Sequence, residues 1–314
     1  MRNAFASEIT AIAAKDDRIV LLSGDIGNRL FDNFKESFPD RFFNCGVAEA
    51  NMTGMAAGMA MCGLRPVTYT ITPFNTTRCL EQIRVDLCYH NLPVVVVGVG
   101  AGLSYSGLGA THHSCEDIAL LRSLPNMAVV CPGDAVEVRL ALRSAAKHNG
   151  PVYLRLGKKN EPVIHKNEPD FEIGKGIVIH EGTDICLLST GNILPVAVSA
   201  GEMLREKGMS TQVVSLHTVK PLDTELLTKV FNSFKIVASV EEHSLIGGLG
   251  SSIAEWVVDQ PPQNARLIRF GSQDRFLHAS GNQENARKIF GLTAQDISEK
   301  ILDISEKILH DMAR

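Results

Sequence analysis

The sequence predicts an α/β protein made of two doubly wound domains. Short β-branched runs alternate with helical patterns along most of its 314 residues. The run Val94-Val95-Val96-Val97 is apolar throughout rather than alternating, as expected for a parallel strand that helices cover on both faces. At about 100–200 residues per domain, the length also favours two domains.

The first domain is expected to span residues 1–160, with five strands and helices between them. Each strand is a short run of apolar and β-branched residues, which is typical of a buried strand. The five runs are Ile19–Leu22, Val67–Thr70, Val94–Val97, Ala128–Cys131 and Val152–Leu154.

A segment richer in Lys, Glu, Pro and Gly follows, and we assign residues 161–182 to an interdomain linker. A second alternation of strands and helices then defines a second domain over residues 183–314. Its strands are expected near Ile185–Leu188, Gln212–Ser215, Ile236–Val240 and Arg266–Arg269.

The end of the chain contains a duplication, because residues 296–302 are repeated as 303–309. This places apolar residues alternately four and three positions apart, at Ile297, Ile301, Ile304 and Ile308. A coiled coil needs more than the roughly two heptads present here, so the stripe predicts a helix docked on the body of the protein.

The composition argues against several classes of partner. The net charge is −4 and the Lys and Arg residues are scattered, so no basic stripe indicates nucleic acid or a membrane surface. The seven cysteines include no Cys-x-x-Cys pair, which favours buried thiols in a reducing compartment over a zinc site. No apolar stretch reaches the roughly 18–20 residues of a membrane span, so we expect a cytoplasmic protein.

Glu49 is an acid placed where the chain enters an apolar helix of small residues. Ala50, Gly54 and Gly58 recur at four-residue spacing on one face of that helix, and each interior glycine costs roughly 0.5–1 kcal/mol relative to alanine. Something must therefore approach this face closely. Taken alone, Glu49 could merely complement the positive end of the helix, an effect of about 0.3–1 kcal/mol.

A glycine-rich loop, residues 98–109, follows the all-valine strand at the end where doubly wound folds bind ligands. It is not a dinucleotide-binding loop, because Leu103 stands where a glycine is needed. It is not a nucleophile elbow either, because its serines lack the Gly-x-Ser-x-Gly frame. His112 and His113 follow the loop, but no acid or thiol at ligand spacing completes a metal site, so none is predicted.

The run from Cys45 to Met55 resembles the segment of the transketolase and 2-oxo acid dehydrogenase superfamily that carries a glutamate contacting the aminopyrimidine ring of thiamine diphosphate. The resemblance continues through the four segments 23–25, 109–112, 124–127 and 150–155. It covers nearly the whole chain and is strongest to the C-terminal half of transketolase, encoded here as a separate polypeptide.

The resemblance implies a role in cofactor binding for four residues. Glu49 would activate thiamine diphosphate, Phe74 would pack on its pyrimidine ring, and Asp25 and Arg78 would lie close to it. Without the resemblance, a lone Phe is more often a core residue, and an Asp after a strand is more often a turn residue.

The resemblance also implies substrate contacts. His112 matches the histidine that contacts the reacting substrate oxygen, and His113 stands beside it where transketolases often have Gln. Arg2 and Lys158 match positions that bind the sugar phosphate, although exposed cations are usually only solvated.

The chain departs from the transketolase pattern at three positions of the expected substrate site. Leu108 stands where an aspartate reads the sugar hydroxyls, and Gly100 falls roughly where transketolases carry a phosphate-binding histidine. Lys158 replaces an arginine and so loses its bidentate fork. The resemblance therefore does not specify the usual pentose phosphates.

A further departure concerns the diphosphate. Related enzymes hold Mg²⁺ and the diphosphate with a Gly-Asp-Gly motif and a following Asn, which Gly24-Asp25-Ile26-Gly27 does not complete. We therefore expect a second polypeptide, an N-terminal diphosphate-binding subunit, to supply the Mg²⁺ ligands in an α2β2 assembly.

These observations predict the C-terminal subunit of a split transketolase-like enzyme, which moves a two-carbon ketol unit from a ketose to an aldose or modified sugar. One alternative is the beta subunit of a 2-oxo acid dehydrogenase, which shares both domains. Another is a regulatory relative without catalytic activity.

Overall fold

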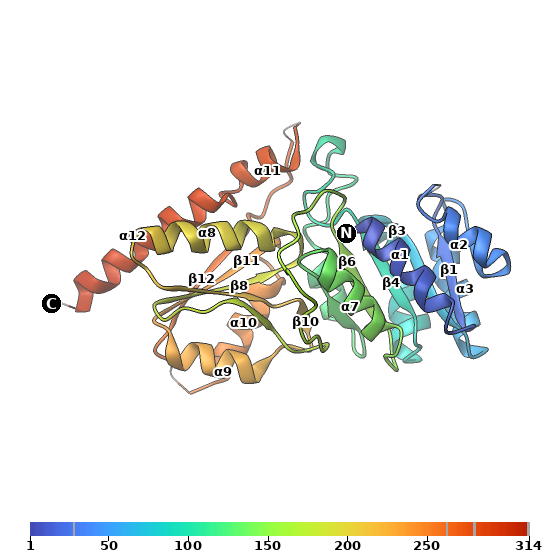
Figure 1. Cartoon of the computed structure of the whole chain (residues 1–314), viewed down its shortest axis with the longest axis horizontal. Helices are drawn as coiled ribbons and strands as arrows, with labels where there is room; N and C mark the ends of the chain where they lie inside the picture. Colours follow the sequence, from blue (N-terminus) through green and yellow to red (C-terminus); the bar gives the residue numbers. More distant parts are fainter. Residues whose placement is uncertain (28, 262, 279–280, 313–314) are drawn as a thin grey trace.

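Figure 1 shows the computed structural model of the chain, which describes residues 1–27, 29–261, 263–278 and 281–312. Two α/β domains lie side by side along the long axis. Each is built on a mostly parallel sheet with helices on both faces, so the predicted fold class is confirmed.

The strands of the first sheet are β1 (Ile19–Ser23), β2 (Phe42–Asn44), β3 (Arg65–Ile71), β4 (Val95–Val99), β5 (Ala128–Val130), β6 (Val152–Leu156) and β10 (Thr218–Lys220). Their order is β10-β5-β6-β4-β3-β1-β2, and all pairs are parallel except β10–β5. Every residue of β1, β4 and β6 is buried, because helices cover both faces of the sheet.

Helices pack on both faces of this sheet. One face carries α1 (Arg2–Ala13), α2 (Asp32–Ser37) and α7 (Ala135–Ala145). The opposite face carries α3 (Glu49–Met61), the π-helix η3 (Ile83–Tyr89) and α6 (Asp117–Arg122). Short helical turns lead from β3 to η3, namely α4 (Thr72–Asn75), η2 (Thr77–Cys79) and α5 (Leu80–Gln82).

The strands of the second sheet are β7 (Ile177–His180), β8 (Ile185–Thr190), β9 (Thr211–Ser215), β11 (Ile236–Ser244) and β12 (Arg266–Ser272), in the order β12-β11-β8-β9-β7. One face packs against α8 (Leu194–Glu206), α11 (Gln283–Ile289) and α12 (Ala294–Met312). The other packs against α9 (Thr224–Ser233) and α10 (Leu249–Val258), whose apolar cluster continues into the first domain.

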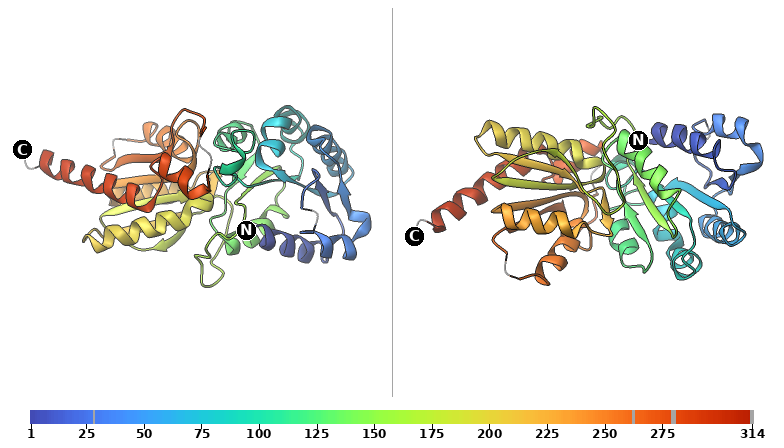
Figure 2. Two further views of the ribbon diagram at one scale, coloured as in Figure 1. Left: turned by 90° about the horizontal axis from the view of Figure 1, so that it is seen from above. Right: turned by 60° about the horizontal axis from the view of Figure 1, so that its bottom comes forward.

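Helix α12 lies along α8 and extends away from the first domain (Figures 1 and 2). Ile297 and Ile301 are fully buried, and Ile304 packs against the same cluster, which confirms the predicted docking face for these residues. The side chain of Ile308 lies outside the described part of the structure.

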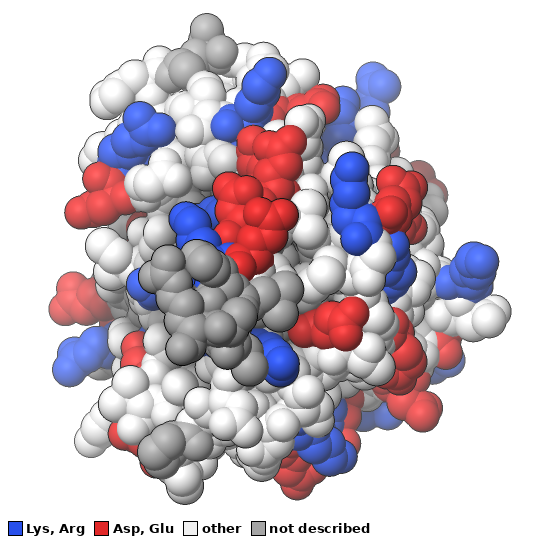
Figure 3. Space-filling model, turned by 90° about the vertical axis from the view of Figure 1, so that its left-hand side faces the viewer, with Lys and Arg blue, Asp and Glu red and all other residues white. Residues whose placement is uncertain are grey.

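Seen from the α12 end, the molecule carries Lys and Arg interspersed with Asp and Glu, and no continuous basic stripe crosses this face (Figure 3). Within the described ranges, no helix combines the length and the apolar composition that crossing a bilayer requires.

Strands β2, β7 and β10 were not predicted. Each has only three or four residues and lies at the edge of its sheet, so none produces a long apolar run. β7 falls inside residues 161–182, the expected linker, where it pairs antiparallel with β9. β10 comes from the second half of the chain but pairs with β5, so the first sheet receives a strand across the domain boundary.

A buried arginine joins the two domains. Arg155 on β6 donates from Nε to Asp117 (2.7 Å), and its Nη2 donates to the carbonyl oxygens of Ser114 and Glu242 (both 3.0 Å). Burial alone would raise the pKa of Asp117, but the charge and hydrogen bonds of Arg155 lower it below its usual value. Glu242 belongs to β11, so one guanidinium contacts both domains.

His217 lies at the same junction, between β9 and β10. Its ring stacks on Phe171 with centroids 4.0 Å apart, and its carbonyl oxygen accepts a hydrogen bond from the Cys131 N–H (2.6 Å). Burial lowers its pKa to about 4.

Lowering the pH from 7 to 5 should therefore reduce the free energy of unfolding by roughly 2 kcal/mol through His217. In the unfolded chain the imidazole takes up a proton near its ordinary pKa of about 6.5, whereas folded His217 stays neutral until about pH 4. This stability is complete above the unfolded pKa and is lost as the pH falls toward the folded one. Urea unfolding at both pH values should show a smaller loss for His217→Phe than for the wild type, with the exposed His90→Phe as control. An equal loss in His217→Phe would contradict the prediction.

Candidate active site

The candidate site residues lie at the carboxyl ends of the parallel strands in the first sheet. β3, β4 and β6 are neighbours there, so the segments that follow them meet at one edge. These segments carry Phe74, His112 and Lys158 respectively, and Glu49 begins α3.

Glu49 is buried, with only 2% of its surface exposed, although it is the first residue of a helix. Both of its carboxylate oxygens lie 2.9 Å from Nη1 of Arg78. The carboxylate is therefore shielded from water and is paired with a single cation, whose own side chain is partly exposed.

The guanidinium of Arg78 also lies over the ring of Phe74, with its central carbon 4.1 Å from the ring centroid. A flat group is thus held by an aromatic face and by hydrogen bonds to the Glu49 carboxylate. An aminopyrimidine ring needs the same two contacts, a face to stack on and an acceptor for a ring N–H. These residues fit the pyrimidine half of thiamine diphosphate.

His112 lies next to this group, with its ring centroid 5.2 Å from that of Phe74. Its Nδ1 is 2.9 Å from Oγ1 of Thr111. Partial burial is the main cause that lowers the pKa of His112, followed by the neighbouring His113 and by the charge of Arg78, and this favours the neutral imidazole. A neutral imidazole can accept or donate a proton at its remaining nitrogen.

Tyr105, which sequence analysis missed, extends the row of contacts. Its ring centroid is 6.0 Å from that of His112, and Nζ of Lys158 lies 4.5 Å from its centroid. Burial raises the pKa of Tyr105, and the charge of Arg2 opposes that rise. The signal that could have indicated Tyr105 is an aromatic residue within a loop of small residues.

Two predicted site residues have other contacts. His113 is buried, and its Nε2 lies 3.1 Å from the carbonyl oxygen of Ser106, so it shapes the loop. Asp25 is exposed and accepts a hydrogen bond from the Asn44 side chain (3.0 Å). Within the described ranges, no hydrogen bond or ion pair joins Asp25 to Glu49, Arg78 or His112.

The second domain holds the loop that carries Tyr105 and His112. The buried carboxylate of Glu242 accepts hydrogen bonds from the Leu103 N–H (2.7 Å), from Nε2 of Gln283 (2.8 Å) and from Nε of Arg287 (2.5 Å). The next loop residue, Ser104, accepts a hydrogen bond from Nδ2 of Asn192 (3.0 Å). Sequence analysis did not identify these contacts.

Gly102 explains how closely the loop approaches the second domain. It has φ +61°, and a Cβ at this position would lie 2.6 Å from the carbonyl oxygen of Glu242. Only glycine allows both the backbone conformation and the close approach.

No group of three or more His, Cys, Asp or Glu side chains among the described residues could hold a metal ion. That a partner subunit supplies the Mg²⁺ ligands stays a prediction from the sequence.

Comparison with known proteins identifies both halves of the chain. Residues 1–163 match the pyrimidine binding domain of transketolase, and residues 174–297 match the C-terminal domain of transketolase. The chain belongs to the transketolase family. The prediction from the resemblance is thereby confirmed, and the protein is a subunit of a transferase-type enzyme.

Several relatives are similar along their whole length. A Methanocaldococcus jannaschii protein named for the C-terminal section of transketolase is 38% identical, over 98% of this chain and 96% of the relative. A 6-deoxy-6-sulfo-D-fructose transketolase subunit from Clostridium sp. is 35% identical, over 98% of this chain and 95% of its own. A split gene transketolase, solved as an inactive β4 tetramer, is 35% identical and superposes with a TM-score of 0.89, covering 96% of this chain and 97% of its own.

The contacts of Glu242 predict a long-range effect on the loop that carries Tyr105 and His112. Glu242→Gln keeps the shape and one acceptor oxygen but leaves the partly buried Arg287 without its charge partner. We expect the free energy of unfolding to fall by roughly 3 kcal/mol and hydrogen exchange to accelerate at residues 100–113.

Urea unfolding and hydrogen exchange monitored by mass spectrometry would measure both effects. Glu284→Gln, an exposed acid on the same helix as Arg287, serves as the matched control and should change stability by less than about 0.5 kcal/mol. Unchanged exchange in the loop of Glu242→Gln would show that the second domain does not hold it.

Proposed function

We propose that this chain is the C-terminal subunit of a split transketolase that binds thiamine diphosphate with Mg²⁺ together with a partner chain. The complex transfers a two-carbon ketol unit from a ketose to an aldose or modified-sugar acceptor. The observation that carries the proposal is the row Glu49, Arg78, Phe74 and His112, in which a buried carboxylate and an aromatic face hold one flat group.

When bound, thiamine diphosphate supplies a carbon nucleophile and an electron sink for the two-carbon unit. Glu49 would accept a hydrogen bond from the pyrimidine nitrogen, and its burial strengthens that bond by excluding water. Arg78 occupies the same carboxylate, so it would move aside for the ring. Phe74 would then support the face of the pyrimidine.

His112 would handle protons on the substrate oxygens. Its lowered pKa favours the neutral imidazole, and Thr111 engages Nδ1, which leaves Nε2 for proton exchange. Asp25, at the end of β1, would lie near the thiazolium, while His113, Lys158 and Arg2 would form the substrate side of the site.

The partner chain would cover the small-residue face of α3. Apart from the adjacent residues and the helix's own backbone, nothing among the described residues lies within 4 Å of a Cβ built on Gly54 or Gly58, and Met61 on the same helix is 57% exposed. This chain therefore does not cover the small-residue face of α3, which a close neighbour was expected to approach. It begins at Glu49, where the other half of the cofactor has to be held.

The relatives favour this function over the alternatives. They are named as transketolase subunits, with none named as a dehydrogenase component among those compared above. The inactive β4 tetramer of the related split enzyme supports the need for a second type of chain. A heterotetramer of two copies of each chain is the assembly we propose.

Glu49→Gln should abolish ketol transfer without unfolding the chain. Removing the charged acceptor should lower turnover by about 10²–10⁴-fold, measured for the reconstituted complex with 3-hydroxypyruvate as donor and an aldose as acceptor. The exposed Glu81→Gln, on the turn that follows Phe74 and Arg78, is the matched control. Turnover of Glu49→Gln close to that of the wild type would exclude this role.

Gly54→Leu should block partner association while leaving the isolated chain folded, because a Cβ built at Gly54 has open space beside the helix among the described residues. Overpacking a close helix contact typically costs about 1–3 kcal/mol, so affinity for the partner should fall at least tenfold. Calorimetric titration with the co-expressed partner would measure this, with Glu202→Leu, at an exposed position of α8, as control. If Gly54→Leu bound the partner normally, α3 would not be the interface.

A further inference from the structure

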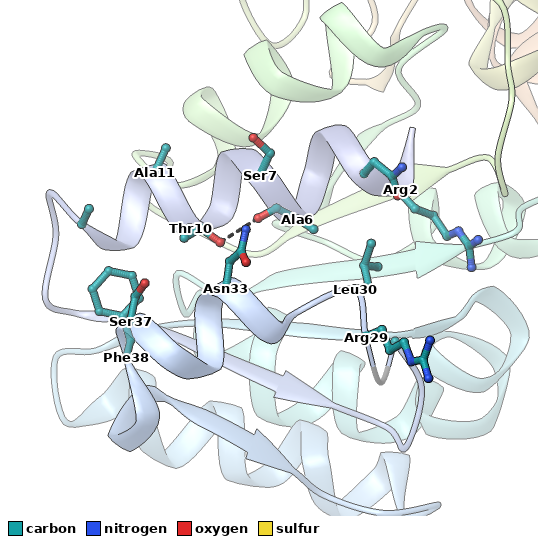
Figure 4. A pocket seen from close by; sticks show the side chains of 13 residues that line it. Arg2, Ala6, Ser7, Thr10, Ala11, Arg29, Leu30, Asn33, Ser37 and Phe38 are labelled. Atoms are coloured by element: carbon teal, nitrogen blue, oxygen red, sulfur yellow. Dashed lines mark hydrogen bonds between the residues drawn. The ribbon is translucent and has the colours of Figure 1, made fainter.

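A pocket of about 540 Å³ lies where the two domains meet. It is lined by residues 159–162 after β6, by Asn192 and the first turns of α8, and by the starts of α11 and α12. A larger groove of about 980 Å³, which ends at Arg2 and Arg29, is lined by described residues of the first domain alone (Figure 4). The smaller pocket is therefore the one through which a ligand could act on both domains.

This pocket lies at the carboxyl end of β8, where the connections of the second sheet change direction. From β8 the chain runs through α8 to β9 on one side, whereas β11, on the other side of β8, is reached through α9. The helices α8 and α9 cover opposite faces of the sheet. Open α/β sheets bind ligands in the crevice at such a switch point. The second domain thus has a ligand-binding position of its own.

Two residues of the pocket have hydrogen-bonding capacity that the protein leaves unused. Arg287 donates from Nε to Glu242 (2.5 Å) and from Nη2 to the carbonyl oxygen of Asn192 (3.2 Å), but its Nη1 has no partner among the described residues. The side chain of Asn192, only 4% exposed, donates from Nδ2 to Ser104, yet its Oδ1 is buried without a partner. A buried acceptor without a donor is costly, so the pair favours a ligand with an anionic group and a hydroxyl.

The charges around the pocket also favour an anion. Lys159 is exposed at its rim and forms no ion pair with a described acid. Glu161 is already paired with the amino group of Met1 (3.0 Å), and Glu284 is exposed to water, which screens its charge. The positive end of α8 lies here as well, because Pro195 in its first turn lines the pocket and no side chain caps this helix.

A ligand on Nη1 of Arg287 would be linked to the proposed active site through two contacts. Arg287 holds the carboxylate of Glu242, and that carboxylate accepts a hydrogen bond from the Leu103 N–H (2.7 Å). Leu103 begins the loop that carries Tyr105 and His112. A ligand that restricts the guanidinium therefore also restricts the loop, even if no atom of the loop changes its position.

We propose that this pocket is an effector site for a small polyhydroxylated anion. Its anionic group binds Nη1 of Arg287 and the ammonium of Lys159, its hydroxyl donates to Asn192, and its binding steadies the loop of Tyr105 and His112. The inference goes beyond the proposed function, because the ligand takes no part in ketol transfer. Sugar carboxylates and sugar phosphates share this chemistry, and the test distinguishes them.

Calorimetric titration of the full chain with D-gluconate, ribose 5-phosphate and uncharged ribose would measure binding. Lys159→Gln should weaken binding of the preferred anion about tenfold, the loss of one charge-assisted contact. Ser199→Phe, at an exposed position of α8 that lines the pocket, should abolish binding by filling it. Glu202→Phe and Lys207→Gln, at exposed positions of α8 and its C-terminal end outside the pocket, are matched controls and should bind as the wild type.

Lys158→Met separates this pocket from the active site. Lys158 lies over the ring of Tyr105, whereas the adjacent Lys159 lines the pocket, so Lys158→Met should leave the binding unchanged. Hydrogen exchange monitored by mass spectrometry supplies the second readout. The saturating anion should slow exchange at residues 100–113 in the wild type and not in Ser199→Phe, a variant that leaves the pair of Arg287 and Glu242 intact.

Four outcomes would overturn the inference. They are no binding of either anion, equal binding of ribose, loss of binding in Lys158→Met rather than in Lys159→Gln, and binding that leaves exchange at residues 100–113 unchanged. None of these measurements requires turnover. The proposed function is therefore tested separately, by ketol transfer in the reconstituted complex.

Discussion

The buried charge of Arg155 constrains the rest of this structure. It is paired with Asp117 at the start of α6, and it also donates to the carbonyl of Ser114, the residue after His113, and to that of Glu242 in the second domain. A buried cation is tolerated only when partners surround it, because transfer of an unpaired charge from water costs several kcal/mol. The loop that carries Tyr105 and His112, α6 and β11 must therefore all be in place together.

The second domain consequently supports the candidate active site although it carries none of the reacting groups proposed. Glu242 holds the N–H of Leu103, and Asn192 holds the side chain of Ser104, so the loop that presents Tyr105 and His112 is fixed at its beginning. Strand β10 adds to this by pairing with β5 of the first sheet. Separation of the domains would release the loop.

The sequence was sufficient for the parts of the fold that produce strong local signals. β4 was predicted because a run of four valines has few alternatives to a buried parallel strand. β2, β7 and β10 were missed because three or four residues at a sheet edge leave no such pattern, and the strand within 161–182 shows that a polar, glycine-containing segment can still pair.

The candidate site likewise contains residues that the sequence indicated and residues that it did not. Glu49, Phe74 and His112 were proposed from the resemblance, and the structure brings them together in one row with Arg78. Tyr105 could not be found because its ring lies where a side chain on residue 100 would be, and that space is open only because residue 100 is glycine. Glu242 could not be found because its partner Leu103 is 139 residues away. Such relations exist only in three dimensions.

The pairing of Arg78 with Glu49 has a consequence for the life of the subunit before assembly. A carboxylate this deeply buried would cost several kcal/mol if it had no partner. Because the neighbouring guanidinium neutralises it, the newly made polypeptide can complete its fold without waiting for cofactor or for a second gene product. Synthesis of the two subunits then need not be synchronised.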